Sequence, residues 1–176
     1  MTAGSLPVTG ALLVLLQLLP LGAVAQQANG IPDGSALGGE VAHLWVNDNP
    51  NTELTLIAFR LSTLRQRRLG FDLEAALATG DGLSGFDLTL GSIYHLPLAG
   101  VGLLFGAGVN ALATGGGDDA GGALGLQLGG SVLLPVSGGS GFRFDVAWRR
   151  YFTGGDGFNA VMVGLGYTSL PHWHWH

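Results

Sequence analysis

Apolar residues alternate with small or polar residues along most of this chain, and period two is the pattern of β-strands. It is clearest in residues 68–79 (RLGFDLEAALAT), where each odd-numbered position from Leu69 to Leu77 is apolar. It recurs in residues 141–170 as two runs joined by Thr-Gly-Gly-Asp-Gly, a composition that favours a turn. The predicted strands are residues 40–47, 53–64, 68–79, 86–96, 101–113, 123–134 and the two halves of 141–170.

The connections between these segments are short and rich in Gly, Pro, Asn and Asp. Sequential strands at this spacing predict an all-β antiparallel meander, and eight of them can close into an up-and-down barrel. The longest connection, residues 114–122, is odd-numbered when the connections are counted from the N-terminus. Long odd connections are typical of transmembrane barrels whose termini both lie in the periplasm.

The amino-acid composition indicates whether the apolar face of the strands lies against lipid or inside a soluble barrel. Hydrophobic residues make up 47% of the chain and charged residues only 11%, and all seven basic residues are Arg. A soluble barrel of the lipocalin type is the alternative, but it would present to water a second face made largely of glycine, of which the chain has 32. We therefore predict a transmembrane barrel with Leu, Val and Phe facing lipid and the glycines facing the lumen.

Long charged side chains share the inward face with these glycines. The residues predicted to form a lumen ion network are Arg60, Asp72, Glu74, Asp87, Arg143, Asp145 and Arg149. Because an unpaired buried charge costs several kcal/mol, we expect the three from residues 141–170 to meet Asp72, Glu74 and Arg60 across the lumen. The sequence thus predicts a nearly neutral network of ion pairs.

Aromatic residues with a polar atom are expected where the barrel wall meets the lipid headgroups. The predicted aromatic girdle consists of Trp45, Tyr94, Trp148 and Tyr167.

The N-terminal segment predicts export. Residues 11–25 are apolar and end in Ala-Val-Ala, a pattern that signal peptidase accepts, and the run is too short for a membrane-spanning helix. We expect residues 1–25 to be a signal peptide and residues 26–39 a flexible lead-in. The barrel is predicted over residues 40–170, followed by a tail at 171–176.

On these features, and on the terminal stretch WRRYF-TGGDG-FNAVMVGLGY, the chain resembles the small eight-stranded outer-membrane barrels of Gram-negative bacteria. These are the OmpA-type transmembrane domain and the opacity-like porin superfamily. The resemblance implies an outer-membrane location, a monomer, and outer-membrane lipid and the barrel assembly machinery as partners. It also implies that the alternating apolar row of the last strand is the assembly signal: Val161, Val163, Leu165 and Tyr167.

Chemical motifs are sparse. Ser92 and His95 lie on opposite faces of one predicted strand, so they do not form a hydrolase pair, and no cofactor is expected. His172, His174 and His176 in the tail are weak candidates for metal ligands. The net charge of −5 argues against nucleic acid as a partner, and zero Cys excludes thiol chemistry.

The sequence therefore favours a non-enzymatic outer-membrane barrel with a structural or surface-interaction role, its lumen closed by Arg–carboxylate pairs. A narrow channel or a carrier of hydrophobic ligands is the alternative, since several inward positions are large and apolar. These positions are Leu54, Leu56, Ile93, Leu104 and Met162. A lipid A-modifying barrel enzyme is a second alternative.

Overall fold

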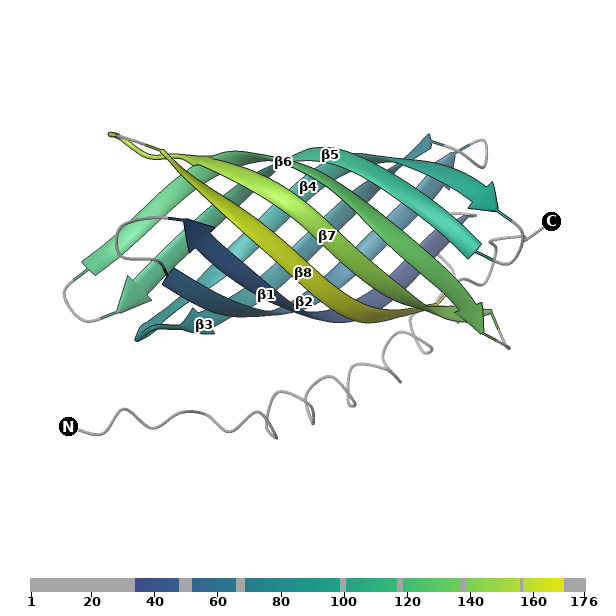
Figure 1. Cartoon of the computed structure of the whole chain (residues 1–176), viewed down its shortest axis with the longest axis horizontal. Helices are drawn as coiled ribbons and strands as arrows, with labels where there is room; N and C mark the ends of the chain where they lie inside the picture. The colour runs from purple at the N-terminus through teal and green to yellow at the C-terminus, as the bar shows by residue number, and fades with distance from the viewer. Residues whose placement is uncertain are drawn as a thin grey trace.

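Eight strands form a closed barrel in which every strand pairs with its neighbours along the chain and β1 pairs with β8 (Figure 1). The computed structural model describes residues 34–47, 52–65, 69–98, 101–116, 119–136, 139–155 and 157–169. The strands are β1 (Ser35–Asn47), β2 (Thr52–Arg65), β3 (Leu69–Gly80), β4 (Leu83–Leu98), β5 (Val101–Gly116), β6 (Asp119–Val136), β7 (Ser140–Phe152) and β8 (Phe158–Ser169). All eight pairings are antiparallel, which confirms the predicted up-and-down barrel.

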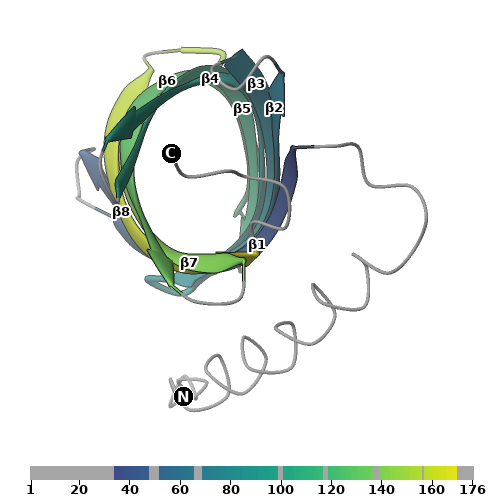
Figure 2. The ribbon, with the colours of Figure 1, turned by 90° about the vertical axis from the view of Figure 1, so that its right-hand side faces the viewer.

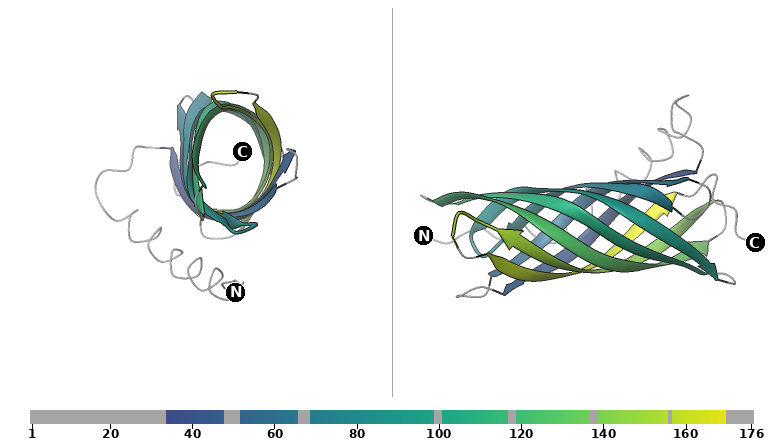
Figure 3. Two further views of the ribbon diagram at one scale, coloured as in Figure 1. Left: turned by 90° about the vertical axis from the view of Figure 1, so that its left-hand side faces the viewer. Right: turned by 90° about the horizontal axis from the view of Figure 1, so that it is seen from above.

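The views along the barrel show the strands as a continuous ring (Figures 2 and 3). Within the part of the chain that the structure describes, no helix is long and apolar enough to cross a membrane. The predicted signal peptide at 1–25 and the tail at 171–176 lie outside the described residues.

Strand β1 begins earlier than the sequence predicts. Ser35 pairs with Thr63 on β2, and Leu37 pairs with both Leu61 and Ser169, so residues 35–39 belong to the wall rather than to a flexible lead-in. The apparent lead-in is rich in glycine, but Gly38 and Gly39 still carry backbone groups that β2 and β8 satisfy.

The connection between β5 and β6 is also shorter than predicted. Most of residues 114–122 continue the sheet, with Thr114 paired with Gly121 and Gly116 paired with Asp119. The hydrogen bonds of a ladder come from the backbone, so a glycine-rich stretch can extend it although it lacks apolar alternation. The prediction that residues 114–122 form a long connection is therefore wrong.

A two-residue turn joins β3 to β4. Gly80 pairs with Leu83, and both intervening residues have positive φ, 48° at Asp81 and 76° at Gly82. Asp-Gly is the sequence that best tolerates this mirror-image turn, whose twist matches that of the strands. The carboxylate of Asp81 also accepts a hydrogen bond of 2.7 Å from the backbone N–H of Glu53, which ties the turn to the start of β2.

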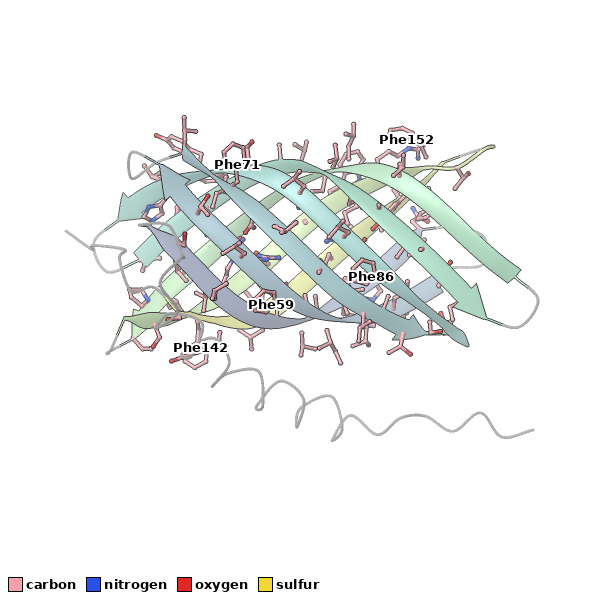
Figure 4. The ribbon with its side chains drawn as sticks, turned by 180° about the vertical axis from the view of Figure 1, so that it is seen from behind. Phe59, Phe71, Phe86, Phe142 and Phe152 are labelled. Atoms are coloured by element: carbon pink, nitrogen blue, oxygen red, sulfur yellow. The ribbon has the colours of Figure 1, made fainter. Side chains whose placement is uncertain are left out.

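The outer wall is apolar. Phe59, Phe71, Phe86, Phe142 and Phe152 project from it and are 43–61% exposed (Figure 4). Leu, Val and Trp side chains occupy most of the other outward positions. This face is the lipid-facing surface that the sequence predicts.

Charged groups are almost absent from the wall. Among the side chains that the structure describes, the Asp, Glu and Arg residues that lie outside the lumen are Glu53, Asp81 and Arg150. All three lie near the odd-numbered connections. The remaining described charges are in the lumen.

Candidate functional site: a charge network across the lumen

Strand alternation places eight charged side chains inside the barrel. They are Glu40 on β1, Arg60 on β2, Asp72 and Glu74 on β3, Asp87 on β4, and Arg143, Asp145 and Arg149 on β7. Seven of them are buried, and the side chain of Asp72 is 13% exposed. In the low dielectric of the lumen such groups need partners.

Arg60 and Arg143 form one cluster with the surrounding carboxylates. Arg60 donates to Asp145 at 2.7 Å, pairs with Glu40 at 2.9 Å and also contacts Glu74. Arg143 donates to Asp72 at 3.1 Å and to Asp145 at 2.9 Å. Each carboxylate is thus shared between, or placed beside, planar guanidinium groups, an arrangement suited to several charge-assisted hydrogen bonds.

Two serines complete this cluster. The hydroxyl of Ser62 donates to Asp72 and accepts from Arg143 at 3.2 Å. Ser131 donates to Asp145 and accepts from Arg143 at 3.0 Å. Both hydroxyls therefore act as donor and acceptor, and they hold Arg143 in one orientation.

Arg149 forms a second cluster that is more deeply buried. Its guanidinium donates to Asp87 at 2.7 Å and to Glu74 at 3.1 Å, and its Nε donates to Gln127 at 3.1 Å. Arg149 and Asp87 are both 0% exposed. The hydroxyl of Tyr151 lies within hydrogen-bond distance of both of them, at 3.3 and 3.4 Å.

Glu74 connects the two clusters. One of its carboxylate oxygens contacts Arg60, and the other accepts from Arg149. Strands β3 and β7 are four positions apart in the ring of eight, on opposite sides of the barrel. The Glu74–Arg149 and Asp72–Arg143 contacts therefore cross the full width of the lumen.

The structure brings together all seven residues of the predicted lumen network. Of the contacts expected across the lumen, it contains Arg143 with Asp72, Arg149 with Glu74, and Asp145 with Arg60. It also contains residues that sequence reasoning missed, Glu40 and Tyr151. With Glu40 included, five carboxyl groups face three guanidinium groups.

Both missed residues fit the alternation. Glu40 has the same parity as Ala42 and Leu44, which are buried, but it stood at the predicted start of its strand. Tyr151 continues the row of Arg143 and Arg149 beyond the predicted end of the charged run. Reading the inward positions through the whole of each predicted strand would have found both.

Apolar side chains fill the lumen on either side of the charges. Toward the odd-numbered connections the layer consists mainly of Leu44, Leu54, Leu56, Leu112, Tyr151 and Met162. Toward the chain ends it consists of Ala36, Ile93, Leu104 and Leu133. Beside Arg60 and Arg143, a cavity of about 30 Å³ is left, which is space for one or two water molecules.

The predicted girdle residues lie at the two rims. Trp45 and Trp148 are outward near the odd-numbered connections, while Tyr94 and Tyr167 are outward near the opposite rim. In the predicted assembly row, Val161 and Leu165 are exposed on the wall and Val163 and Tyr167 are half-buried beside them. Tyr167 donates a hydrogen bond of 2.6 Å to Ser140 and packs edge-on against Phe142.

The serine and histidine candidates do not meet. Ser92 is exposed on the wall and His95 is buried in the lumen, as expected for opposite faces of β4. His43 points outward, whereas Ser62 and Ser131 point inward. Over the described strands, no group of three His, Asp or Glu side chains has the geometry of a metal site. The tail histidines lie outside the described residues.

A lipid-facing wall and a charged, side-chain-filled lumen in a closed eight-stranded barrel define a transmembrane β-barrel of the outer-membrane type. No protein-family model matches the chain, and no curated protein sequence is significantly similar to it. Solved structures do match the fold. Neisserial surface protein A aligns with a TM-score of 0.68 at 12% identity, over 78% of this chain and 97% of that one.

Two further structures align at lower scores. The N-terminal barrel domain of Pseudomonas aeruginosa OprF gives a TM-score of 0.55 at 14% identity, over 77% of this chain and 98% of that one. The outer-membrane enzyme PagL gives 0.54 at 13% identity, over 74% and 98%. At such low identity these likenesses show the fold alone, and they confirm the predicted eight-stranded barrel.

Proposed function

We propose that this protein is a non-enzymatic, non-conducting outer-membrane barrel with a structural or surface-interaction role, and that the Arg–carboxylate network seals its lumen. The observation that carries the proposal is the pair of contacts from β7 to β3, Arg143 with Asp72 and Arg149 with Glu74. Among the described residues, these side chains span the barrel and oppose a continuous water path through it.

The energetics favour a permanently closed state. Removing one partner from a buried ion pair costs about 3–5 kcal/mol, because the other charge is left without compensation. A water path past Arg149 would have to separate several such contacts at once, since this guanidinium bonds to Asp87, Glu74 and Gln127. The apolar layers above and below the charges add a further barrier to ions.

The lumen gives little support to a carrier of hydrophobic ligands. Leu54, Leu56, Ile93, Leu104 and Met162 are at most 3% exposed and pack against one another in the two apolar layers. A space of about 30 Å³ is too small for an acyl chain. PagL shares the fold and is an enzyme, but the serine and histidine candidates of this chain lie on opposite sides of the wall.

Planar-bilayer recording on the purified protein tests the seal. Folding is verified first by the shift in gel migration between unheated and heated samples. The folded protein should give no discrete conductance steps. Reproducible steps from folded wild-type protein would overturn the seal and favour the narrow channel.

A deletion strain tests the cellular role. Loss of the protein should lower the resistance of the envelope to detergent or reduce surface attachment, and wild-type protein supplied in trans should restore either property. If the deletion instead changes only the uptake of small solutes, the structural role is wrong. A change in the lipid A mass spectrum would favour the enzyme.

A further inference from the structure

Two tryptophans flank a valine on the outer wall near the odd-numbered connections. Val161 on β8 pairs with Trp45 on β1 at one side and with Trp148 on β7 at the other. Two strand spacings separate the tryptophans, about 10 Å between their backbones. Because Val161 is much smaller than its neighbours, the row forms a slot with aromatic walls and an aliphatic floor.

Polar side chains line the outward edge of this slot. Asn47 pairs with Asn159 one step nearer the rim, and Thr52 and Glu53 border the same groove from β2. The groove has a volume of about 390 Å³, within the range of small-molecule sites. It is an open depression at the rim, where the inward-facing Val46 and Ala160 also line it, and it lies apart from the charge network of the lumen.

His43 and Glu53 hold one wall of the groove. The imidazole of His43 lies 3.3 Å from a carboxylate oxygen of Glu53, and its ring packs edge-on against Trp45 with centroids 4.3 Å apart. The indole of Trp45 is therefore braced from the side away from Val161. The carboxylate of Glu53 remains 59% exposed at the edge of the groove.

The chemistry of this lining suits a sugar ring. Indole faces pack against the C–H bonds of a pyranose, while a carboxylate, two amides and a hydroxyl supply acceptors and donors for its hydroxyl groups. Glu53 in the lining would repel a phosphate, and Arg150, the pairing partner of Asn159, lies outside the lining. Below the slot the wall continues as Val163 and Val146, an apolar track toward the membrane centre.

We propose that this groove binds the saccharide headgroup of an outer-leaflet glycolipid. The ring lies between Trp45 and Trp148, its hydroxyls bond to Asn47 and Asn159 at the rim, and the attached chain runs along Val163 and Val146. The inference does not depend on closure of the lumen, and each can fail without the other.

Three probes separate the parts of this ligand. Octyl β-D-glucoside has the sugar and a chain, octyl tetraethylene glycol ether has the chain alone, and methyl β-D-glucoside has the sugar alone. Isotope-labelled protein in phosphatidylcholine nanodiscs is titrated with each, and the amide NMR shifts of Asn47, Asn159 and Val161 are followed. Octyl glucoside should give saturable shifts at all three, and the other two probes should give weak or linear changes.

Substitutions assign the binding to the groove. Asn159→Ala and Trp148→Leu should each weaken octyl glucoside binding about tenfold, as expected for one lost hydrogen bond or stacking contact. Phe105→Leu is the matched control, because Phe105 is an exposed aromatic residue on β5, away from the groove. All variants are checked for heat-modifiable migration.

Equal saturable shifts from octyl tetraethylene glycol ether would show an apolar slot without sugar recognition and would overturn the proposal. Equal binding of methyl glucoside would make a free saccharide the ligand and would overturn the glycolipid assignment. Absence of saturable shifts with octyl glucoside in folded protein would overturn it entirely.

Discussion

The carboxylate of Glu40 lies in the space that a side chain at position 164 would need. Gly164 on β8 pairs with Ala42 on β1, and a Cβ built on Gly164 would overlap Oε1 of Glu40. Glycine at this position is therefore a packing requirement of the charge network at the seam that closes the barrel.

Gly164→Ala should destabilise the protein by about 1–3 kcal/mol, the usual cost of overpacking a filled interior. Urea unfolding in phospholipid vesicles measures the change. Gly106→Ala is the matched control, because its nearest neighbours, Ile93 and Ser92, would be 3.6 Å away. If overlap with Glu40 causes the loss of stability, Gly164→Ala should destabilise a Glu40→Ala variant less than it destabilises the wild type. Equal losses in the two backgrounds would contradict this explanation.

Two glutamates of the network should respond differently to replacement by glutamine. Glu74 accepts from Arg60 and Arg149 with different oxygens, and glutamine offers only one acceptor oxygen, so Glu74→Gln should cost about 3 kcal/mol. Glu40 pairs with Arg60 through one oxygen, and its other oxygen has no hydrogen-bond partner among the described residues. Glutamine can keep this single contact, so Glu40→Gln should change stability by less than about 1 kcal/mol.

The same unfolding experiment decides between these outcomes. Equal losses of stability in the two variants would mean that the contacts of Glu74 with two arginines add no more stability than the single contact of Glu40. A larger loss for Glu40→Gln would contradict the argument that Glu40 depends on one oxygen and Glu74 on two.

Depth in the membrane should set the cost of a charge on the wall. Leu90 is outward near the middle of β4, and Leu90→Arg should cost about 2–4 kcal/mol. Phe152, exposed at the end of β7 near the rim, is the control, and Phe152→Arg should cost at most about 1 kcal/mol. Vesicle unfolding of both variants measures the difference. Equal costs would argue against a hydrocarbon layer around this wall.

Tyr167 should matter more for assembly in cells than for the stability of the folded barrel. Tyr167→Ala removes the aromatic end of the row predicted as the assembly signal, and the fraction of heat-modifiable protein in the outer membrane should fall several-fold. Ser140→Ala is the control, because it removes the hydrogen bond of Tyr167 and leaves the aromatic ring. Refolding of purified Tyr167→Ala in micelles should stay efficient. Failure there would assign the defect to stability.

The alternation of inward and outward positions along each strand predicts much of this architecture. Once Leu69 and Phe71 are placed outward, Asp72 and Glu74 must face inward, and the same reasoning puts Arg143 and Arg149 in the lumen. Parity also separates Ser92 from His95. The faces of the strands, and hence the class of protein, are therefore accessible from the sequence.

The ends of strands and the exact partners are less accessible. Residues 35–39, 114–116 and 119–122 are rich in glycine and show no apolar alternation, although their backbones pair with neighbouring strands. Glu74 is shared between Arg60 and Arg149 because of the stagger of β2, β3 and β7 around the ring. The sequence of a single strand does not determine this stagger. Glu40 lies at the first position of the predicted strand 40–47, where the alternation has only one neighbour to support it.

The distribution of charge also dictates an order of events during biogenesis. Arg60 on β2 contacts Asp145 on β7, and these two strands come together only when β1 pairs with β8 and the ring is complete. An open sheet would present these groups to hydrocarbon, at a cost of about 2.5–3.5 kcal/mol or more for each. Curling of the wall and its entry into the bilayer must therefore proceed together, and a flat sheet cannot serve as an inserted intermediate.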